Sequence, residues 1–125
     1  MQLGDHLITP RVGYTHHGVY VGFGKVIHYS GYTGGVKEGV MLTSLEEFEQ
    51  GMQARVIRHD FRRYSAKRIV ERAYSRLGED DYNLLLNNCE HFVSWCIWGV
   101  RSSRQVKQAM LGVAMVAGYL FAMWD

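Results

Sequence analysis

The chain has 125 residues, of which 47% are hydrophobic and 21% are charged, and its formal net charge is +2. These proportions are close to those of average soluble globular proteins, so they exclude a disordered chain, a collagen and a disulfide-rich miniprotein. The length fits one domain with a core of its own. The small positive charge does not by itself indicate a protein that binds nucleic acid.

The first third of the chain, residues 5–41, has the pattern of β-strands. Two runs of β-branched and aromatic residues, 19–21 and 26–29, are separated by Gly22-Phe23-Gly24, which predicts a β-hairpin. A glycine-rich stretch follows at 31–39, and a possible strand at 39–42. The first six residues contain no apolar run, so we expect no signal peptide.

Helical patterns dominate the second half of the chain. The expected elements are a short helix capped by Thr43 or Ser44, a strand at 54–59, a helix from Ser65 to Gly78 and a helix from Cys89 to about Trp98. Strands that come first and helices that come later predict an α+β fold, in which an antiparallel sheet packs against helices.

Basic residues are concentrated between positions 55 and 76, where eight Arg and Lys residues accompany two acidic residues. Two interpretations stay open for this stretch. It is either an ordinary solvated surface or a site for an anionic partner such as a lipid headgroup or RNA. No specific binding of nucleic acid is predicted.

The two cysteines, Cys89 and Cys96, are seven residues apart in a stretch with a helical pattern. Two helical turns separate their Cα atoms by about 10 Å, which is too far for a disulfide. Neither cysteine has the spacing of a zinc site. Two free thiols indicate a reducing compartment, so we expect a cytoplasmic protein.

The residues that begin the last of these helices carry the chemical signal. If Asn88 is the N-cap, Cys89 is the first helical residue and lies at the positive end of the helix dipole. That position is expected to lower the pKa of a thiol and to supply backbone N–H groups for an oxyanion. Cys96 lies in the middle of the helix and is expected to fill the core.

A thiol nucleophile needs a histidine base from another element. His91 lies on the same helix as Cys89 but points about 200° away from it, since an α-helix turns about 100° per residue. The better candidates are His16, His17 and His28, which lie on the two strands of the predicted hairpin.

The register of this hairpin decides which histidine faces His28. A hairpin centred on Gly22 places His16 directly opposite His28, on one face of the sheet. A two-residue turn at Phe23-Gly24 would instead bring His17 to that face and turn His16 away. We expect the first arrangement.

Two motifs of the chain resemble a known family. The stretch Tyr14-Thr15-His16-His17-Gly18-Val19-Tyr20-Val21-Gly22 resembles the histidine box of the lecithin:retinol acyltransferase family, and Asn87-Asn88-Cys89-Glu90-His91-Phe92-Val93 resembles its asparagine–cysteine motif. The resemblance covers roughly residues 4–100, and the order and spacing of the two motifs make it specific. The family includes the phospholipase A/acyltransferases and has a permuted papain-like fold.

The resemblance implies roles for three residues. Cys89 matches the nucleophile of the family, His16 matches the general base, and His28 matches the residue that orients the base. The implied chemistry is attack of the thiol on a phospholipid ester, which gives an acyl-thioester on Cys89. Water or another acceptor then takes the acyl group, and no metal or organic cofactor is implied.

Two other functions stay open at this point. The same triad suits an amide or peptide hydrolase, and some viral relatives use the fold as a non-catalytic interaction module. The presence of all three residues, Cys89, His16 and His28, favours the enzyme.

The C-terminal segment has a different character from the rest. Residues 109–124 carry no charge, and Arg101, Arg104 and Lys107 stand just before them. We therefore expect a catalytic domain at 1–100 and a basic flank with an apolar helix at 101–125. As a helix, the run would be about 24 Å long, against about 30 Å for the hydrocarbon core of a bilayer. It is interpreted as a membrane anchor, an interfacial or buried helix, or an oligomer contact.

Overall fold

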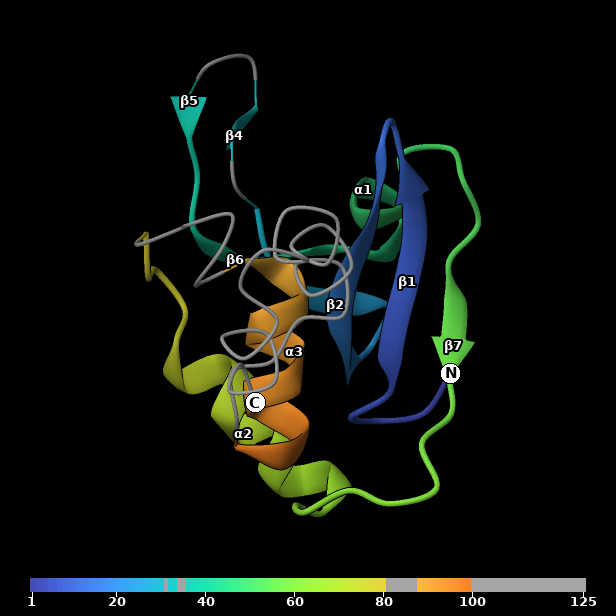
Figure 1. Ribbon diagram of the computed structural model, residues 1–125, viewed down its shortest axis with the longest axis vertical. Helices are drawn as coiled ribbons and strands as arrows, with labels where there is room; N and C mark the ends of the chain where they lie inside the picture. Colours follow the sequence, from blue (N-terminus) through green and yellow to red (C-terminus); the bar gives the residue numbers. More distant parts are fainter. Residues whose placement is uncertain (31, 34–35, 81–87, 100–125) are drawn as a thin grey trace, which may run out of the picture.

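The computed structural model describes residues 1–30, 32–33, 36–80 and 88–99 (Figure 1). Its strands are β1 (His6–Arg11), β2 (Tyr14–Gly22), β3 (Lys25–Tyr29), β4 (Tyr32–Thr33), β5 (Val36–Lys37), β6 (Val40–Ser44) and β7 (Arg55–Ile57). Its helices are α1 (Leu45–Glu49), α2 (Ala66–Ser75) and α3 (Cys89–Trp98). The predicted α+β fold is confirmed.

Five of the strands form one antiparallel sheet in the order β6-β3-β2-β1-β7, and β4 pairs with β5 in a separate hairpin. The central strand is β2, which is bonded to β1 on one side and to β3 on the other. Because side chains alternate along a strand, β2 presents successive residues to opposite faces of the sheet. Both of its neighbouring histidines, His16 and His17, are therefore in the middle of the fold.

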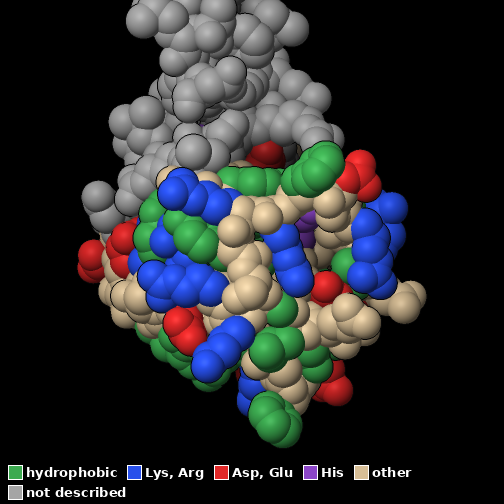
Figure 2. Space-filling model, turned by 90° about the horizontal axis from the view of Figure 1, so that it is seen from below, with side chains coloured by type: hydrophobic (Ala, Val, Ile, Leu, Met, Phe, Trp, Pro, Cys, Tyr) green, Lys and Arg blue, Asp and Glu red, His purple; other side chains and the backbone are tan. Residues whose placement is uncertain are grey.

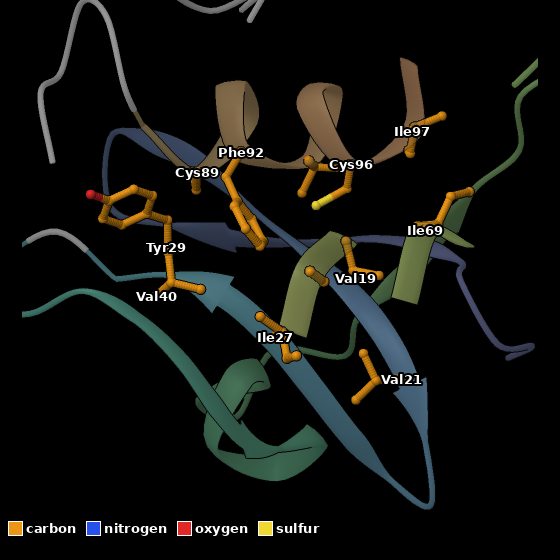
Figure 3. Packing of buried hydrophobic residues seen from close by; sticks show 12 residues of the cluster. Val19, Val21, Ile27, Tyr29, Val40, Ile69, Cys89, Phe92, Cys96 and Ile97 are labelled. Carbon is orange, nitrogen blue, oxygen red and sulfur yellow. The ribbon is translucent and has the colours of Figure 1, made fainter. Parts of the chain in front are cut away.

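Each face of the sheet is covered by its own helices and has its own hydrophobic core. On one face, α2 and α3 pack over a core whose residues include Val19, Ile27 and Phe92 (Figures 1 and 3). On the other face, α1 contributes Phe48 to a smaller core around Leu7. Both faces of β2 are therefore shielded from water.

The β2–β3 hairpin differs from its expected register. Its turn has two residues, Phe23 and Gly24, both with positive φ, and Gly22 pairs with Lys25. A β-bulge between Tyr20 and Gly22 then shifts the register by one residue. As a result His28 lies opposite Gly18, and the expectation that it lies opposite His16 is wrong.

The bulge nevertheless keeps the expected face. A two-residue turn alone would have turned His16 away from His28, and the extra residue in β2 reverses that effect. The pair Gly18–His28 places His16 two residues along the same strand, on the same face as His28. The prediction that these two histidines share a face is confirmed.

The predicted helix starts are confirmed by their caps. The hydroxyl of Ser44 accepts from the N–H of Glu47 at α1, and the hydroxyl of Ser65 accepts from the N–H of Arg68 at α2. Helix α2 ends at Ser75, earlier than the expected Gly78, because its last residues continue as a turn.

The basic stretch divides between the surface and the interior. The face seen from below in Figure 1 carries Lys and Arg side chains among hydrophobic ones (Figure 2). Arg72 and Arg76 are partly buried instead, and their guanidinium groups lie over the ring of Trp95 at 3.7 and 4.9 Å from its centroid. These two cations serve the packing of α2 against α3.

Both cysteines are free and buried, as expected from their spacing. The basic flank and the apolar helix expected at 101–125 lie outside the described residues. Within the described part of the chain, none of the helices has the length and apolar character needed to cross a membrane.

Candidate active site

Cys89 occupies the position that its sequence context predicts. Asn88 is the N-cap of α3, and its side-chain oxygen accepts from the N–H groups of Glu90 and His91, both at 3.0 Å. The imidazole of His91 completes a capping box, because its Nδ1 accepts from the N–H of Asn88 at 3.2 Å. His91 therefore supports the helix start, and Cys89 is the first helical residue.

The same cap changes one expectation about this helix end. Two of the N–H groups that were expected to stabilise an oxyanion, those of Glu90 and His91, are bonded to the side chain of Asn88. The N–H of Cys89 has no such bond among the described residues. It acts on the sulfur of the same residue.

The thiol of Cys89 lies against the backbone of β2, where its sulfur is bonded by the N–H of His17. The direction of this N–H follows from the sheet. The N–H of Tyr20 donates to the carbonyl of Asp5, just before β1, and therefore points to the β1 side of β2. Successive N–H groups along a strand point to alternate sides. The N–H of His17, an odd number of residues away, therefore points to the β3 side. The β2–β3 pairing ends at Gly18–His28, so the thiol takes a place that a strand partner would otherwise have.

Burial dominates the ionisation of this thiol. Cys89 is only 3% exposed, and desolvation raises the pKa of its thiol to about 11, although the N–H groups of His17, Glu90 and Cys89 itself act in the opposite direction. The expectation that the helix end gives a low thiol pKa is wrong. The helix N-terminus lowers the pKa as expected, but by less than desolvation raises it.

On the other face of β2, His16 and His28 form a hydrogen-bonded chain with Thr43. Nε2 of His16 lies 2.8 Å from Nδ1 of His28, and Nε2 of His28 lies 3.1 Å from the hydroxyl of Thr43. That hydroxyl donates to the carbonyl of Ser44 at 3.1 Å. All three side chains are buried.

The direction of the last bond fixes the protons of the whole chain. Since the hydroxyl of Thr43 gives its only proton to Ser44, it accepts from Nε2–H of His28. Nδ1 of His28 is then an acceptor and receives Nε2–H of His16. Nδ1 of His16 is left without a proton, and this buried atom has no hydrogen-bond partner among the described residues. It is a buried lone pair, which is what a general base needs.

The surroundings keep both imidazoles neutral. Desolvation, followed by the charges of His28, Arg11 and His17, lowers the pKa of His16 to about 2. Desolvation and the charge of Arg11 lower the pKa of His28 to about 4. With a neutral thiol on Cys89 as well, the resting site holds a thiol and an imidazole rather than a thiolate and an imidazolium.

An aromatic ring covers the two imidazoles. The ring of Phe48 lies 5.3 Å from the ring centroids of both His16 and His28. It comes this close because Gly18, between the two histidines, has no side chain. A Cβ at this position would lie 2.8 Å from the ring of Phe48 and 2.7 Å from Val26.

Two residues of the β1–β2 hairpin connect the imidazole face to the thiol. Arg11 donates to the carbonyl of Phe48 at 2.6 Å, and the ring of Tyr14 meets that of His16 edge to face at 6.2 Å. Desolvation lowers the pKa of Arg11 and raises that of Tyr14, and a negative charge on Cys89 raises both. The thiol is therefore electrostatically coupled to residues that surround His16, although α3 packs on the other face.

The sequence motifs did not reveal all of these residues. Thr43 was considered only as a helix cap, and Gly18 was read only as part of a motif. A signal for Thr43 exists in the alternation of β6, which places it on the face of Val26, its partner in β3. The pairing of β6 with β3 is needed before that signal can be used.

The two motifs lie within a longer match to known proteins. The family model described as Lecithin retinol acyltransferase matches residues 1–102. The chain belongs to the lecithin retinol acyltransferase family. The resemblance in the two motifs is thereby confirmed, and the site described above lies entirely within the matched region.

Individual members of this family are similar over most of the chain. Phospholipase A and acyltransferase 2 of Homo sapiens is 33% identical, over 97% of this chain and 85% of its own. Phospholipase A and acyltransferase 4 of Homo sapiens is 30% identical over 95% of this chain and 88% of its own. Lecithin retinol acyltransferase of Bos taurus is 28% identical over 90% of this chain, which spans 61% of that relative.

Proposed function

We propose that this protein transfers or hydrolyses fatty acyl groups of phospholipids through an acyl-thioester on Cys89. The family and the names of its members support the acyl-transfer chemistry. The observation that carries the mechanism is Nδ1 of His16, which is unprotonated and has no partner in the part of the chain that the structure describes. In this proposal Cys89 is the nucleophile, His16 the general base and His28 the residue that orients the base.

The first half-reaction begins from neutral groups. His16 takes the proton of the Cys89 thiol on Nδ1 while the sulfur attacks the ester carbonyl carbon. The carbonyl oxygen becomes an oxyanion, and the N–H of Cys89, which is not bonded to the Asn88 cap, is our candidate donor for it. The intermediate then expels the lyso-lipid oxygen, which takes the proton from His16, and the acyl group stays on sulfur.

The second half-reaction reverses these roles. Water, or an acceptor amine or hydroxyl, attacks the thioester carbonyl with its oxygen or nitrogen. His16 removes a proton from this attacking molecule at the same time. The sulfur of Cys89 leaves and recovers the proton. Throughout, His28 accepts from Nε2–H of His16 and stabilises the imidazolium that forms for a moment, as the third member of a catalytic triad does.

A neutral resting pair suits a buried site. A thiolate in this environment would lack the solvation that burial removes, so the proton leaves the sulfur only when a substrate carbonyl is in place to receive the sulfur's electrons. The resting thiol should then react slowly with electrophiles that do not bind in the site.

The test is the intact mass of the protein after incubation with a short-chain phospholipid. We expect one acyl adduct, which localises to Cys89 by peptide mapping. Cys89→Ser should show no thioester, whereas Cys96→Ser should form the adduct like the parent, because Cys96 lies within α3, two turns after Cys89, and is buried in the core. An adduct on Cys96, or equal loss in both variants with both folded, would contradict the proposal.

A further inference from the structure

A second chain of polar side chains lies on the α2–α3 face of β2, and the reaction above does not use it. Nε2 of His59 lies 2.9 Å from Nδ1 of His6, and Nε2 of His6 lies 2.7 Å from Nδ1 of His17. Nε2 of His17 lies 3.4 Å from a carboxylate oxygen of Glu90. Four elements therefore meet in this chain: the segment between β7 and α2, then β1, β2 and α3.

Among the described residues, the number of ring protons in this chain matches the number of contacts that join its members. A neutral imidazole carries one ring proton, and three imidazoles make three links. The carboxylate of Glu90 lies 3.4 Å from Nε2 of His17 and favours the proton on that nitrogen, because a lone pair there would face a negative charge. His6 then donates from Nε2 to His17, and His59 donates from Nε2 to His6. All three rings have the same tautomer, and every link is directed toward Glu90.

This arrangement is a line and does not surround a point. His6 and His17 each use both ring nitrogens for neighbours on opposite sides, so their lone pairs do not converge as metal ligands do. Among the described residues, no group of three or more His, Cys, Asp and Glu side chains is arranged to hold a metal ion. The geometry is that of a proton-conducting chain that ends on a carboxylate.

The inner end of the chain adjoins the thiol. Glu90 follows Cys89 in α3, and its negative charge raises the pKa of the thiol. His17 acts on the same atom in the opposite sense, because its backbone N–H is bonded to the sulfur. The outer end, His59, is half-buried against the ring of Trp98 and is the member nearest to solvent.

We propose that Glu90 and His17 are positioning residues that control the ionisation of the Cys89 thiol. Desolvation is the main cause that keeps the resting thiol protonated, and the charge of the Glu90 carboxylate adds to it. A proton taken up by the imidazole chain would cancel that added effect. The titratable groups that face Glu90 in this scheme are Cys89 on its own helix and His17 on β2, with His6 and His59 behind His17. The inference deepens the proposed function, because it concerns the same thiol.

A coupled chain of this kind leaves a mark on the reactivity of the thiol. The logarithm of a thiol alkylation rate normally rises with pH in a straight line below the thiol pKa, since the thiolate is the reacting form. In the pH range in which the imidazole chain loses its additional proton, the charge of the Glu90 carboxylate is no longer cancelled. That charge then opposes ionisation of the thiol. The line should flatten there by about one logarithmic unit, because a like charge at this range shifts a pKa by roughly one unit or more.

The experiment measures alkylation of Cys89 by iodoacetamide from about pH 5 to about pH 10, by intact mass, in a Cys96→Ser background. The parent should show the flattened region. Glu90→Gln should remove it and should react about tenfold faster on its alkaline side, because the amide has nearly the same shape as the carboxylate without its charge. Glu71→Gln, which removes an exposed carboxylate on α2, is the matched control and should behave like the parent.

A second variant tests the imidazole directly. His17→Gln keeps the backbone N–H on the sulfur and a donor for Glu90, but it removes the titrating ring, so the flattened region should disappear while the alkaline rate stays near that of the parent. If Glu90→Gln does not fold, the His17→Gln variant alone still shows whether the imidazole causes the flattened region. A parent profile without the flattened region, or a flattened region that survives in His17→Gln, would overturn the proposal.

Nitrogen NMR of the imidazoles gives a second measurement. We expect His6, His17 and His59 all to carry their proton on Nε2 at alkaline pH, and a ring with the proton on Nδ1 would overturn the directed chain. Alkylation needs no acyl donor. A protein that forms no acyl adduct can still show the flattened region, so this proposal and the proposed function fail separately.

Discussion

Two neighbouring histidines of β2 have the same side chain and opposite chemistry. His16 and His17 are both buried, and each is hydrogen-bonded to a second imidazole. The chain that contains His16 ends on the hydroxyl of Thr43, and the chain that contains His17 ends on the carboxylate of Glu90. The difference between the two faces lies in these last partners.

The last partner decides which nitrogen of each ring is available. On the Thr43 side, every proton is directed away from the thiol, and His16 is left with an unprotonated Nδ1 that has no partner among the described residues. On the Glu90 side, both ring nitrogens of His17 are engaged, one with His6 and one with Glu90. Of two histidines one residue apart, only His16 therefore keeps a bare ring nitrogen among the described residues, as the proposed base requires.

The largest effect expected from this comparison is a difference between two alanine variants. His16→Ala should lower turnover of a short-chain phospholipid at least about 100-fold, the usual loss for a general base. His17→Ala should cost far less, because its backbone N–H remains and its side chain leaves the opposite face of the strand. The measurement is kcat for both variants, with thermal unfolding to show that both are folded. A greater loss in His17→Ala would mean that His17, and not His16, is the general base.

A second prediction concerns the glycine that lets the ring of Phe48 cover His16 and His28. In Gly18→Ala the new Cβ would lie 2.7 Å from Cγ1 of Val26 and 2.8 Å from Cε1 of Phe48, both in the core. Overpacking of this kind typically costs about 1–3 kcal/mol of unfolding free energy. Urea unfolding should show this loss, and turnover should fall with it as the ring is displaced.

A compensating variant separates crowding from other causes. Phe48→Leu reduces the volume above position 18, so the double variant with Gly18→Ala should be more stable than the sum of the two single changes predicts. Strictly additive effects would show that the ring does not crowd position 18, and the close approach would then need another explanation.

The start of α3 could be predicted from sequence because its determinants are local. Asn88 caps the helix with its own side chain, and Gly99 ends it with a positive φ, so Cys89 was correctly placed at the first helical position. The caps at Ser44 and Ser65 are of the same kind. Their signals need no information from distant parts of the chain.

The hairpin register and the thiol pKa could not be predicted in this way. The bulge between Tyr20 and Gly22 has no signal in the local sequence pattern, and it offsets a turn that would otherwise have reversed the face of His16. The pKa of Cys89 depends on how closely α3 and β2 exclude water, which is a property of the packed fold. The role of Thr43 likewise appears only when β6 has paired with β3.

The smallest effect expected from the comparison of the two faces of β2 concerns the hydroxyl of Thr43. Thr43→Val keeps the shape of the side chain but removes both the acceptor for His28 and the donor to Ser44. Without the Thr43 acceptor, the proton of His28 is no longer held on Nε2. His28 can then fail to accept from Nε2–H of His16, which is the bond that keeps Nδ1 of His16 unprotonated. A single hydrogen bond contributes about 1 kcal/mol, so turnover should fall by about fivefold. Thr43→Ser, which restores the hydroxyl, should recover most of it.

The matched control for this variant is another buried threonine, Thr9, which lies opposite His16 in β1. Its hydroxyl donates to the carbonyl of Met52 at 2.7 Å and has no hydrogen bond to either imidazole among the described residues. Thr9→Val removes the same kind of hydrogen bond, so it should cost similar stability and leave turnover of the folded protein unchanged. If Thr43→Val and Thr9→Val reduce turnover equally, the hydroxyl of Thr43 only stabilises the fold. A loss confined to Thr43→Val and reversed by serine means that the direction of the protons on this face of β2 is set from β6, one strand beyond the histidines themselves.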